Sequence, residues 1–89
     1  MKFRDFLEEQ LKDPEFRKIY ERDKIKYDII SQTIAERNRQ NLTQKDLADR
    51  METKQASVSR FENGNVNPSL DFLIKLAESL GKKLEVKFV

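Results

Sequence analysis

The 89-residue chain is long enough for one folded domain but too short to enclose a deep catalytic cavity as well. It contains no Cys and no His, which excludes disulfide bonds, thiolate or imidazole zinc sites, and Ser/His or Cys/His nucleophile pairs. Its net charge of only +2 disfavours a protein that coats nucleic acid without regard to sequence. We therefore expect a binding protein rather than an enzyme, with neither a metal nor a cofactor.

The charges are distributed unevenly, with a net −1 on residues 1–23, +2 on residues 24–64 and +1 on residues 65–89. The first apolar run is interrupted by Arg4, Asp5 and Glu8, so it does not read as a signal peptide. No stretch approaches the length of a membrane span. The sequence thus predicts a cytoplasmic protein without a membrane partner.

Residues 1–23 predict two short amphipathic helices. The first ends near Lys12, and Asp13-Pro14-Glu15 restarts the chain with Asp as N-cap and Pro at the first helical position. The apolar residues of both helices either pack on the core of the same chain or form an arm that docks a partner protein. The candidate docking residues are Phe3, Phe6, Leu7, Phe16, Ile19 and Tyr20.

A third helix is expected from about Lys24 to Gln40, with Asn41 as its left-handed stop. At about 100° per residue it carries two separate apolar stripes. One stripe comprises Tyr27, Ile30 and Ile34, and the other comprises Ile25 and Ile29. We expect the first stripe to pack on the segment that follows and the second to pack on the N-terminal helices.

The segment from Thr43 to Gly64 predicts two short helices joined by a tight turn, which is a helix-turn-helix signature. Thr43 can cap the first helix, and Asp46 three residues later can reach back to it. The second helix begins near Thr53 or Lys54 and ends at Gly64. The apolar residues expected to face the core are Leu47, Ala48, Met51, Val58 and Phe61.

The second of these helices presents a polar outer face that lies opposite Val58 and Phe61. This face comprises Gln55, Ala56, Ser59, Arg60 and Asn63. In the major groove of DNA, Gln can bond adenine, Arg can bond guanine, and Ala can touch the thymine methyl group. An ordinary solvated helix surface is the alternative interpretation of the same face.

The last predicted helix starts at Pro68 and closes at Gly81. Its core residues are expected to be Leu70, Leu73, Ile74, Ala77 and Leu80.

The tail that follows alternates like a β-strand, with apolar Leu84, Val86 and Phe88 separated by Glu85 and Lys87. A single strand leaves its backbone unpaired, so it requires a partner. The candidate partners are residues 1–4, the tail of a second copy, or the sheet edge of another protein, and a frayed tail is the alternative.

The stretch from about Ile30 to Leu84, roughly 55 of the 89 residues, resembles the lambda-repressor-like (Xre/Cro type) DNA-binding domain. LTQKDLA, QASVSRFENG and NPSLDFLIKLAESLG carry the resemblance in the order of the family. It implies an all-α bundle of five to six helices, here with an N-terminal helical extension over residues 1–23 and a DNA-binding domain over residues 24–89 that ends in a short β-strand.

The resemblance also assigns roles to single residues. Arg37 and Glu62 match a pair that forms a salt bridge behind the motif in the family, with a phosphate contact as the alternative role of Arg37. Glu52 stands where the family usually has Gly. A non-Gly residue there implies either a strained backbone angle or a slightly different turn, which would change the tilt of the second helix of the motif. The implied DNA-binding residues are Gln44, Lys54, Gln55, Ala56, Ser59, Arg60 and Asn63.

LEEQLKDPEFRKIYE, which leads into this domain, resembles the N-terminal segment of HigA-like antitoxins of bacterial toxin–antitoxin modules. This resemblance implies an antitoxin that neutralises a RelE/HigB-type toxin and represses its own operon as a homodimer on an inverted repeat of double-stranded DNA. Leu84, Val86 and Phe88 are the candidate dimerisation residues. The alternatives are a phage-type or housekeeping repressor with no toxin partner, and a protein-interaction module that keeps the motif only as a scaffold.

Overall fold

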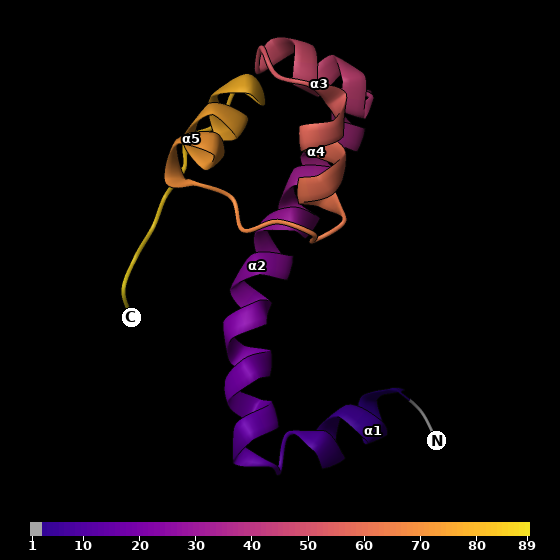
Figure 1. Ribbon diagram of the computed structural model, residues 1–89, viewed down its shortest axis with the longest axis vertical. Helices are drawn as coiled ribbons and strands as arrows, with labels where there is room; N and C mark the ends of the chain where they lie inside the picture. Colours follow the sequence, from indigo (N-terminus) through magenta and orange to yellow (C-terminus); the bar gives the residue numbers. More distant parts are fainter. Residues whose placement is uncertain (1–2) are drawn as a thin grey trace.

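The computed structural model describes residues 3–89, with side chains described from residue 4 onward. This part of the chain folds into five helices, α1 (Phe3–Gln10), α2 (Pro14–Arg39), α3 (Gln44–Arg50), α4 (Gln55–Glu62) and α5 (Leu70–Ser79). The long α2 forms the axis of the molecule, with α3, α4 and α5 around one end and α1 at the other (Figure 1). The predicted all-α class is therefore correct, and the molecule is elongated at 43 × 30 × 21 Å.

Helix α2 is a single helix of 26 residues. Its predicted start is confirmed, because the side chain of Asp13 accepts a hydrogen bond from the backbone N–H of Glu15 at 3.0 Å and Pro14 is the first helical residue. The helix boundary expected near Lys24 is wrong. No Gly or Pro interrupts residues 15–39, so the shift of the apolar stripe does not break the helix.

The two stripes on α2 do not both face where the sequence suggested. Ile30 is buried and Ile34 packs against the core as expected, but Tyr27 is 57% exposed. The second stripe was expected to contact the N-terminal helices, and this expectation is wrong. Ile25 and Ile29 instead line an open groove between α2, α5 and the tail, because a continuous helix cannot fold back on its own N-terminal half.

Each of the helices α2 to α5 is followed, two residues after its last helical residue, by a residue in the left-handed conformation. The four residues are Asn41, Glu52, Gly64 and Gly81, with φ between 55° and 76°. In each case the next N–H reaches back to a carbonyl in the last turn, as Thr53 does to Ala48 at 2.9 Å. The chain has only two glycines, so the other two ends carry Asn and Glu.

The core lies between α3, α4 and the C-terminal half of α2. The largest fully buried side chains are Leu47, Met51, Val58 and Phe61. Helix α5 covers this core with Leu76 and Leu80, and Phe72 packs its ring 5.4 Å from that of Phe61. Burial of these side chains supplies most of the stabilisation, at about 1.5–3 kcal/mol for each large one.

Two expectations for α5 need correction. The helix starts at Leu70 with Ser69 as N-cap, because the Ser69 side chain accepts from the N–H of Phe72. Leu70 and Ile74 were expected in the core but are 61% and 39% exposed. The helix is rotated so that Leu76 faces inward, and periodicity alone does not show which edge of an apolar stripe is covered.

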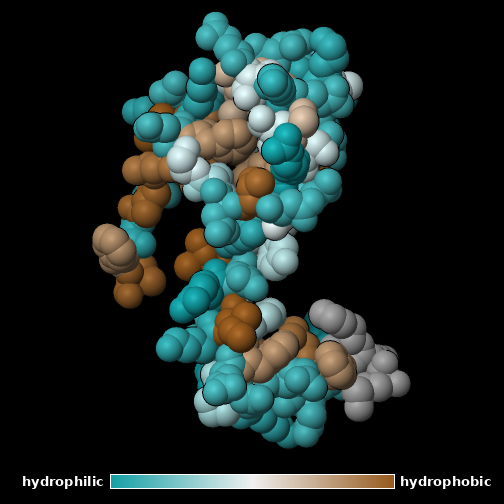
Figure 2. Space-filling view, in the orientation of Figure 1, coloured by the Kyte–Doolittle hydropathy of each residue, from teal (hydrophilic) through white to brown (hydrophobic). Residues whose placement is uncertain are grey.

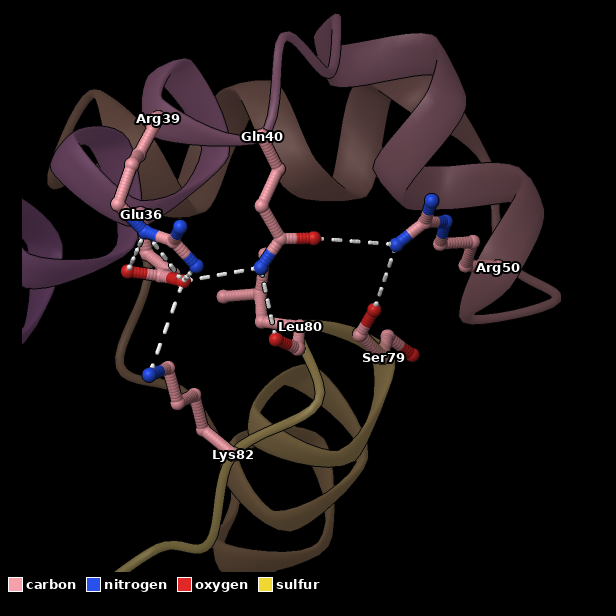
Figure 3. Close-up of polar contacts among 7 residues, drawn as sticks. All are labelled: Glu36, Arg39, Gln40, Arg50, Ser79, Leu80 and Lys82. Atoms are coloured by element: carbon pink, nitrogen blue, oxygen red, sulfur yellow. Dashed lines mark hydrogen bonds and ion pairs between the residues drawn. The ribbon is translucent and has the colours of Figure 1, made fainter.

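A polar cluster joins the C-terminal ends of α2, α3 and α5 (Figure 3). The side chain of Gln40 donates to the backbone oxygen of Leu80 at 2.8 Å and to Glu36 at 2.9 Å. Arg50 donates to the backbone oxygen of Ser79 at 3.3 Å. These side chains satisfy carbonyls that the end of α5 leaves unpaired, and so they fix α5 against α2 and α3.

The tail after α5 forms no strand in the described part of the chain, so the predicted C-terminal β-strand is wrong. Its backbone N–H groups beyond Lys82 donate no hydrogen bond to another described residue. Phe3 and Arg4, which were considered as a pairing segment, belong to α1 instead, and residues 1–2 lie outside the described residues. A lone strand without a neighbour gains no ladder bonds and has no reason to adopt strand geometry.

Helix α1 and the first turns of α2 lie away from the core (Figure 1) and form a segment that we call the arm, residues 4–23. Phe6 and Ile19 are 49% and 58% exposed. Phe16 and Tyr20 are half-buried and stack on one another with ring centres 6.4 Å apart. Packing of the arm on the core is therefore not observed, and the side chain of Phe3 lies outside the described residues.

Candidate nucleic-acid interface

The first helix of the motif, α3, is fixed at its N-terminus by the predicted capping box. Thr43 Oγ1 accepts from the N–H of Asp46 at 3.0 Å, and Asp46 Oδ2 accepts from the N–H of Thr43 at 2.9 Å. The hydrogen bond from the backbone N–H of Thr43 holds the pKa of the Asp46 carboxyl below its ordinary value. The cap places Gln44 at the first helical position, at the exposed end of α3.

The turn between α3 and α4 contains the departure that the sequence indicated. Glu52 has φ 55°, so a non-Gly residue does hold the left-handed angle there. Lys54 follows in extended conformation and is the N-cap of α4, although its side chain makes no capping hydrogen bond. The start of α4 therefore has no side-chain cap.

Helix α4 buries one face and exposes the other. Val58 and Phe61 are 0% and 1% exposed, which anchors the helix on the core. On the opposite face Gln55, Ala56, Arg60 and Asn63 are exposed and Ser59 is half-buried. The structure thus brings the predicted base-facing residues onto one surface, and their contact with DNA stays a prediction.

Two cations at this surface carry no internal partner. Lys54 and Arg60 form no hydrogen bond or ion pair through their side chains with any described residue, whereas Lys45 pairs with Asp49 at 3.0 Å. The surface around α3 and α4 is hydrophilic in the space-filling view (Figure 2). Unpaired cations on a polar helix face are available to bind an anionic ligand such as the DNA backbone.

Behind the motif, Arg37 and Glu62 form the predicted salt bridge. The guanidinium Nε and Nη2 each lie 2.9 Å from a carboxylate oxygen, and the two side chains are only 14% and 3% exposed. Gln44 Nε2 also donates to Glu62, at 3.1 Å. The sequence interpretation missed this last bond, which joins the first residue of α3 to the last residue of α4.

None of the helices in the described part of the chain is long and apolar enough to cross a membrane. Residues 3–89 also hold no group of three or more acidic, His or Cys side chains arranged to bind a metal ion.

The family model for helix-turn-helix domains matches residues 34–87, which include the end of α2 and all of α3, α4 and α5. An uncharacterized HTH-type transcriptional regulator of Haemophilus influenzae is 36% identical over 58 residues, which span 65% of this chain and 59% of that protein. A second such regulator, from Methanocaldococcus jannaschii, is 37% identical over 49 residues, which span 55% of this chain and 74% of that protein.

A solved structure described as a toxin–antitoxin module from Streptococcus pneumoniae contains a chain of similar fold. The similarity has a TM-score of 0.69 at 31% identity and covers 100% of this chain and 93% of that chain. It therefore extends over α1 and the N-terminal half of α2, which the family model does not match.

Proposed function

This chain belongs to the helix-turn-helix family of transcriptional regulators, and from that premise we propose that it is a sequence-specific repressor that also serves as the antitoxin of a toxin–antitoxin module. The observation that carries the antitoxin part is the similarity of the whole chain, arm included, to a chain of the S. pneumoniae module. A regulator without a toxin partner would need only the part that the family model matches.

The outer face of α4 is the DNA-reading surface in this proposal. Gln55 is suited to paired hydrogen bonds with adenine, Arg60 to paired hydrogen bonds with guanine, and Ala56 to contact with a thymine methyl group. Ser59, between them on the same face, adds a hydroxyl for a base edge. The residues proposed to hold phosphates are Gln44, Lys54 and Asn63.

We further propose that two copies bind an inverted repeat, with recognition helices about 34 Å apart. The proposed dimer contact is the tail. Val86 and Phe88 are 69% and 104% exposed, and Leu84 lines the groove of about 910 Å³ between α2, α5 and the tail. Pairing with the tail of a second copy would bury these side chains and satisfy the unpaired backbone of both tails.

The arm is the proposed docking site for the toxin. Apolar side chains of the arm lie at the surface, at the end of the molecule away from α3 and α4 (Figures 1 and 2). Phe6 and Ile19 are the most exposed of them, beside Leu7, Phe16 and Tyr20. A RelE/HigB-type toxin bound there would have its active surface covered without any chemistry by this chain, and α4 would remain accessible to DNA.

The test of the antitoxin function is affinity purification of the tagged full chain from its source cells, with identification of the proteins and DNA that co-purify. Ile19→Asp places a charge on the proposed docking face, and Lys18→Asp is the matched control because it changes the charge more at the adjacent exposed position. We expect a small protein to co-purify with the wild-type chain and with Lys18→Asp, and to be lost with Ile19→Asp, whereas DNA is retained by all three.

Retention of the small protein by both Ile19→Asp and Phe6→Asp would exclude the arm as its docking site. If the wild-type chain retains DNA but no small protein, a phage-type or housekeeping repressor is the better account. That second candidate is favoured by the two relatives described as transcriptional regulators.

A further inference from the structure

Glu62 connects the two helices of the motif through an enclosed carboxylate. Its side chain is 3% exposed and accepts three hydrogen bonds, two from Arg37 at 2.9 Å and one from Gln44 Nε2 at 3.1 Å. Arg37 is fixed in turn, because its Nη1 donates to the backbone oxygen of Leu42 at 2.9 Å. Gln44 is therefore attached to an anchor that has little freedom to move.

The chemistry of this contact fixes which end of the Gln44 amide faces inward. A carboxylate only accepts hydrogen bonds, whereas a Gln side chain ends in a carbonyl oxygen on one side and an NH₂ group with two donors on the other. The flipped amide would place its oxygen against the oxygen of Glu62, which is repulsive. Glu62 thus selects the NH₂ group and uses one of its two N–H bonds, and the second N–H has no partner among the described residues.

We propose that Glu62 is a positioning residue for DNA binding, because it orients the amide of Gln44 so that the second N–H is held ready to donate to a phosphate oxygen. The inference rests on the proposed DNA-binding function and deepens it. Arg37 contributes by neutralising Glu62, so that the carboxylate behind Gln44 does not repel the phosphate. A glutamine without this anchor would have to lose the rotational freedom of its side chain when it binds the phosphate.

A purely structural Glu62 is distinguished from a positioning residue by a double-mutant cycle. The variants are Glu62→Gln, Gln44→Ala and the double variant, with binding measured by fluorescence anisotropy on a labelled duplex that the wild-type chain selects from a random-sequence pool. We expect Glu62→Gln to weaken binding by about 3- to 10-fold, as for one net hydrogen bond. In the Gln44→Ala background we expect a loss of no more than about 2-fold, because there is no amide left to orient.

Equal losses from Glu62→Gln in both backgrounds would overturn the inference, since a structural defect does not depend on residue 44. Glu36→Gln is the matched control, because it also removes a carboxylate. The carboxylate of Glu36 accepts hydrogen bonds from Arg39 and Gln40 and from no residue of α3 or α4. It should show no coupling to Gln44. If the wild-type chain selects no duplex at all, the proposed function itself fails, which is a different result from selection without coupling.

A second measurement uses the wild-type fold and does not depend on whether Glu62→Gln folds. In ¹⁵N-labelled wild-type protein, the two NH₂ protons of Gln44 are assigned by their absence in Gln44→Ala. We expect one proton to be shifted downfield and protected from solvent exchange without DNA, and the other to move when the selected duplex is added. Free solvent exchange of both protons at the ordinary chemical shifts of a Gln side chain, or a shift of both on adding DNA, would contradict the proposal.

Discussion

Glu52→Gly tests whether the turn of the motif stores backbone strain. Glu52 has φ 55°, where a Cβ destabilises the folded state by about 1–2 kcal/mol. Glycine removes this strain but lowers the stability by about 0.5–1 kcal/mol, because it gives the unfolded chain more conformational freedom. The Glu52 side chain is exposed and makes no hydrogen bond or ion pair with a described residue, so no contact is lost. We therefore expect the free energy of unfolding to rise by roughly 0.5–1 kcal/mol.

Urea and thermal unfolding followed by circular dichroism measure this change, which corresponds to a Tm increase of about 2–8 °C for a domain of this size. Glu52→Ala is the control for the lost charge, since it keeps a Cβ at the same angle, and it should stay within about 0.5 kcal/mol of wild type. Asn41→Gly, at φ 57°, should gain less, because Asn tolerates this conformation. A stabilisation by Ala equal to that by Gly would refute backbone strain as the cause.

Leu47→Ala, at a fully buried position, should lower the free energy of unfolding by about 2–5 kcal/mol in the same urea experiment, and a loss below 1 kcal/mol would contradict its place in the core. Hydrogen bonds from Arg39, and then from Gln40, lower the pKa of Glu36 from 4.5 to about 2. The contribution of the Glu36 carboxylate to stability is therefore complete above pH 4.5 and is lost as the pH falls toward 2. Glu36→Gln should flatten the decline in the free energy of unfolding between pH 4.5 and 2. An unchanged decline would contradict a stabilising role of this carboxylate. Arg60→Ala should weaken binding to the selected duplex by about 1–3 kcal/mol and relax the base preference, whereas Lys54→Ala should weaken binding to all sequences alike and reduce the salt dependence. Unchanged affinity in Arg60→Ala would favour a protein-interaction module that keeps the motif only as a scaffold.

The features that the sequence predicted correctly are mostly local. Asp13-Pro14 starts α2, Thr43 and Asp46 form a capping box, and Gly64 and Gly81 take the left-handed angle after α4 and α5. Each depends on a few neighbouring residues whose side chains or backbone preferences act within one turn. The polar face of α4 was also predictable, because helical spacing alone places Ala56 and Arg60 nearly opposite Val58.

The errors concern contacts between segments that are distant in sequence. A strand requires a partner that no local pattern supplies, so the alternation of Leu84, Val86 and Phe88 did not make one. The helix boundary expected near Lys24 was inferred because the apolar stripe moves to another face of the helix there. A helix ends, however, only where caps or other partners satisfy the backbone groups of its last turn. The exposure of Ile74 likewise depends on how α5 is rotated against α3 and α4.

By itself, the sequence determined where four of the five helices begin or end and which face of α4 is polar and exposed, because caps, glycines and periodicity act within a single turn. Only the tertiary structure decided that α2 extends the arm away from the core, that the tail stays without a strand, and that Gln44 meets Glu62 across two helices. These features depend on which distant segments pack together and which find no partner, and no local pattern specifies either.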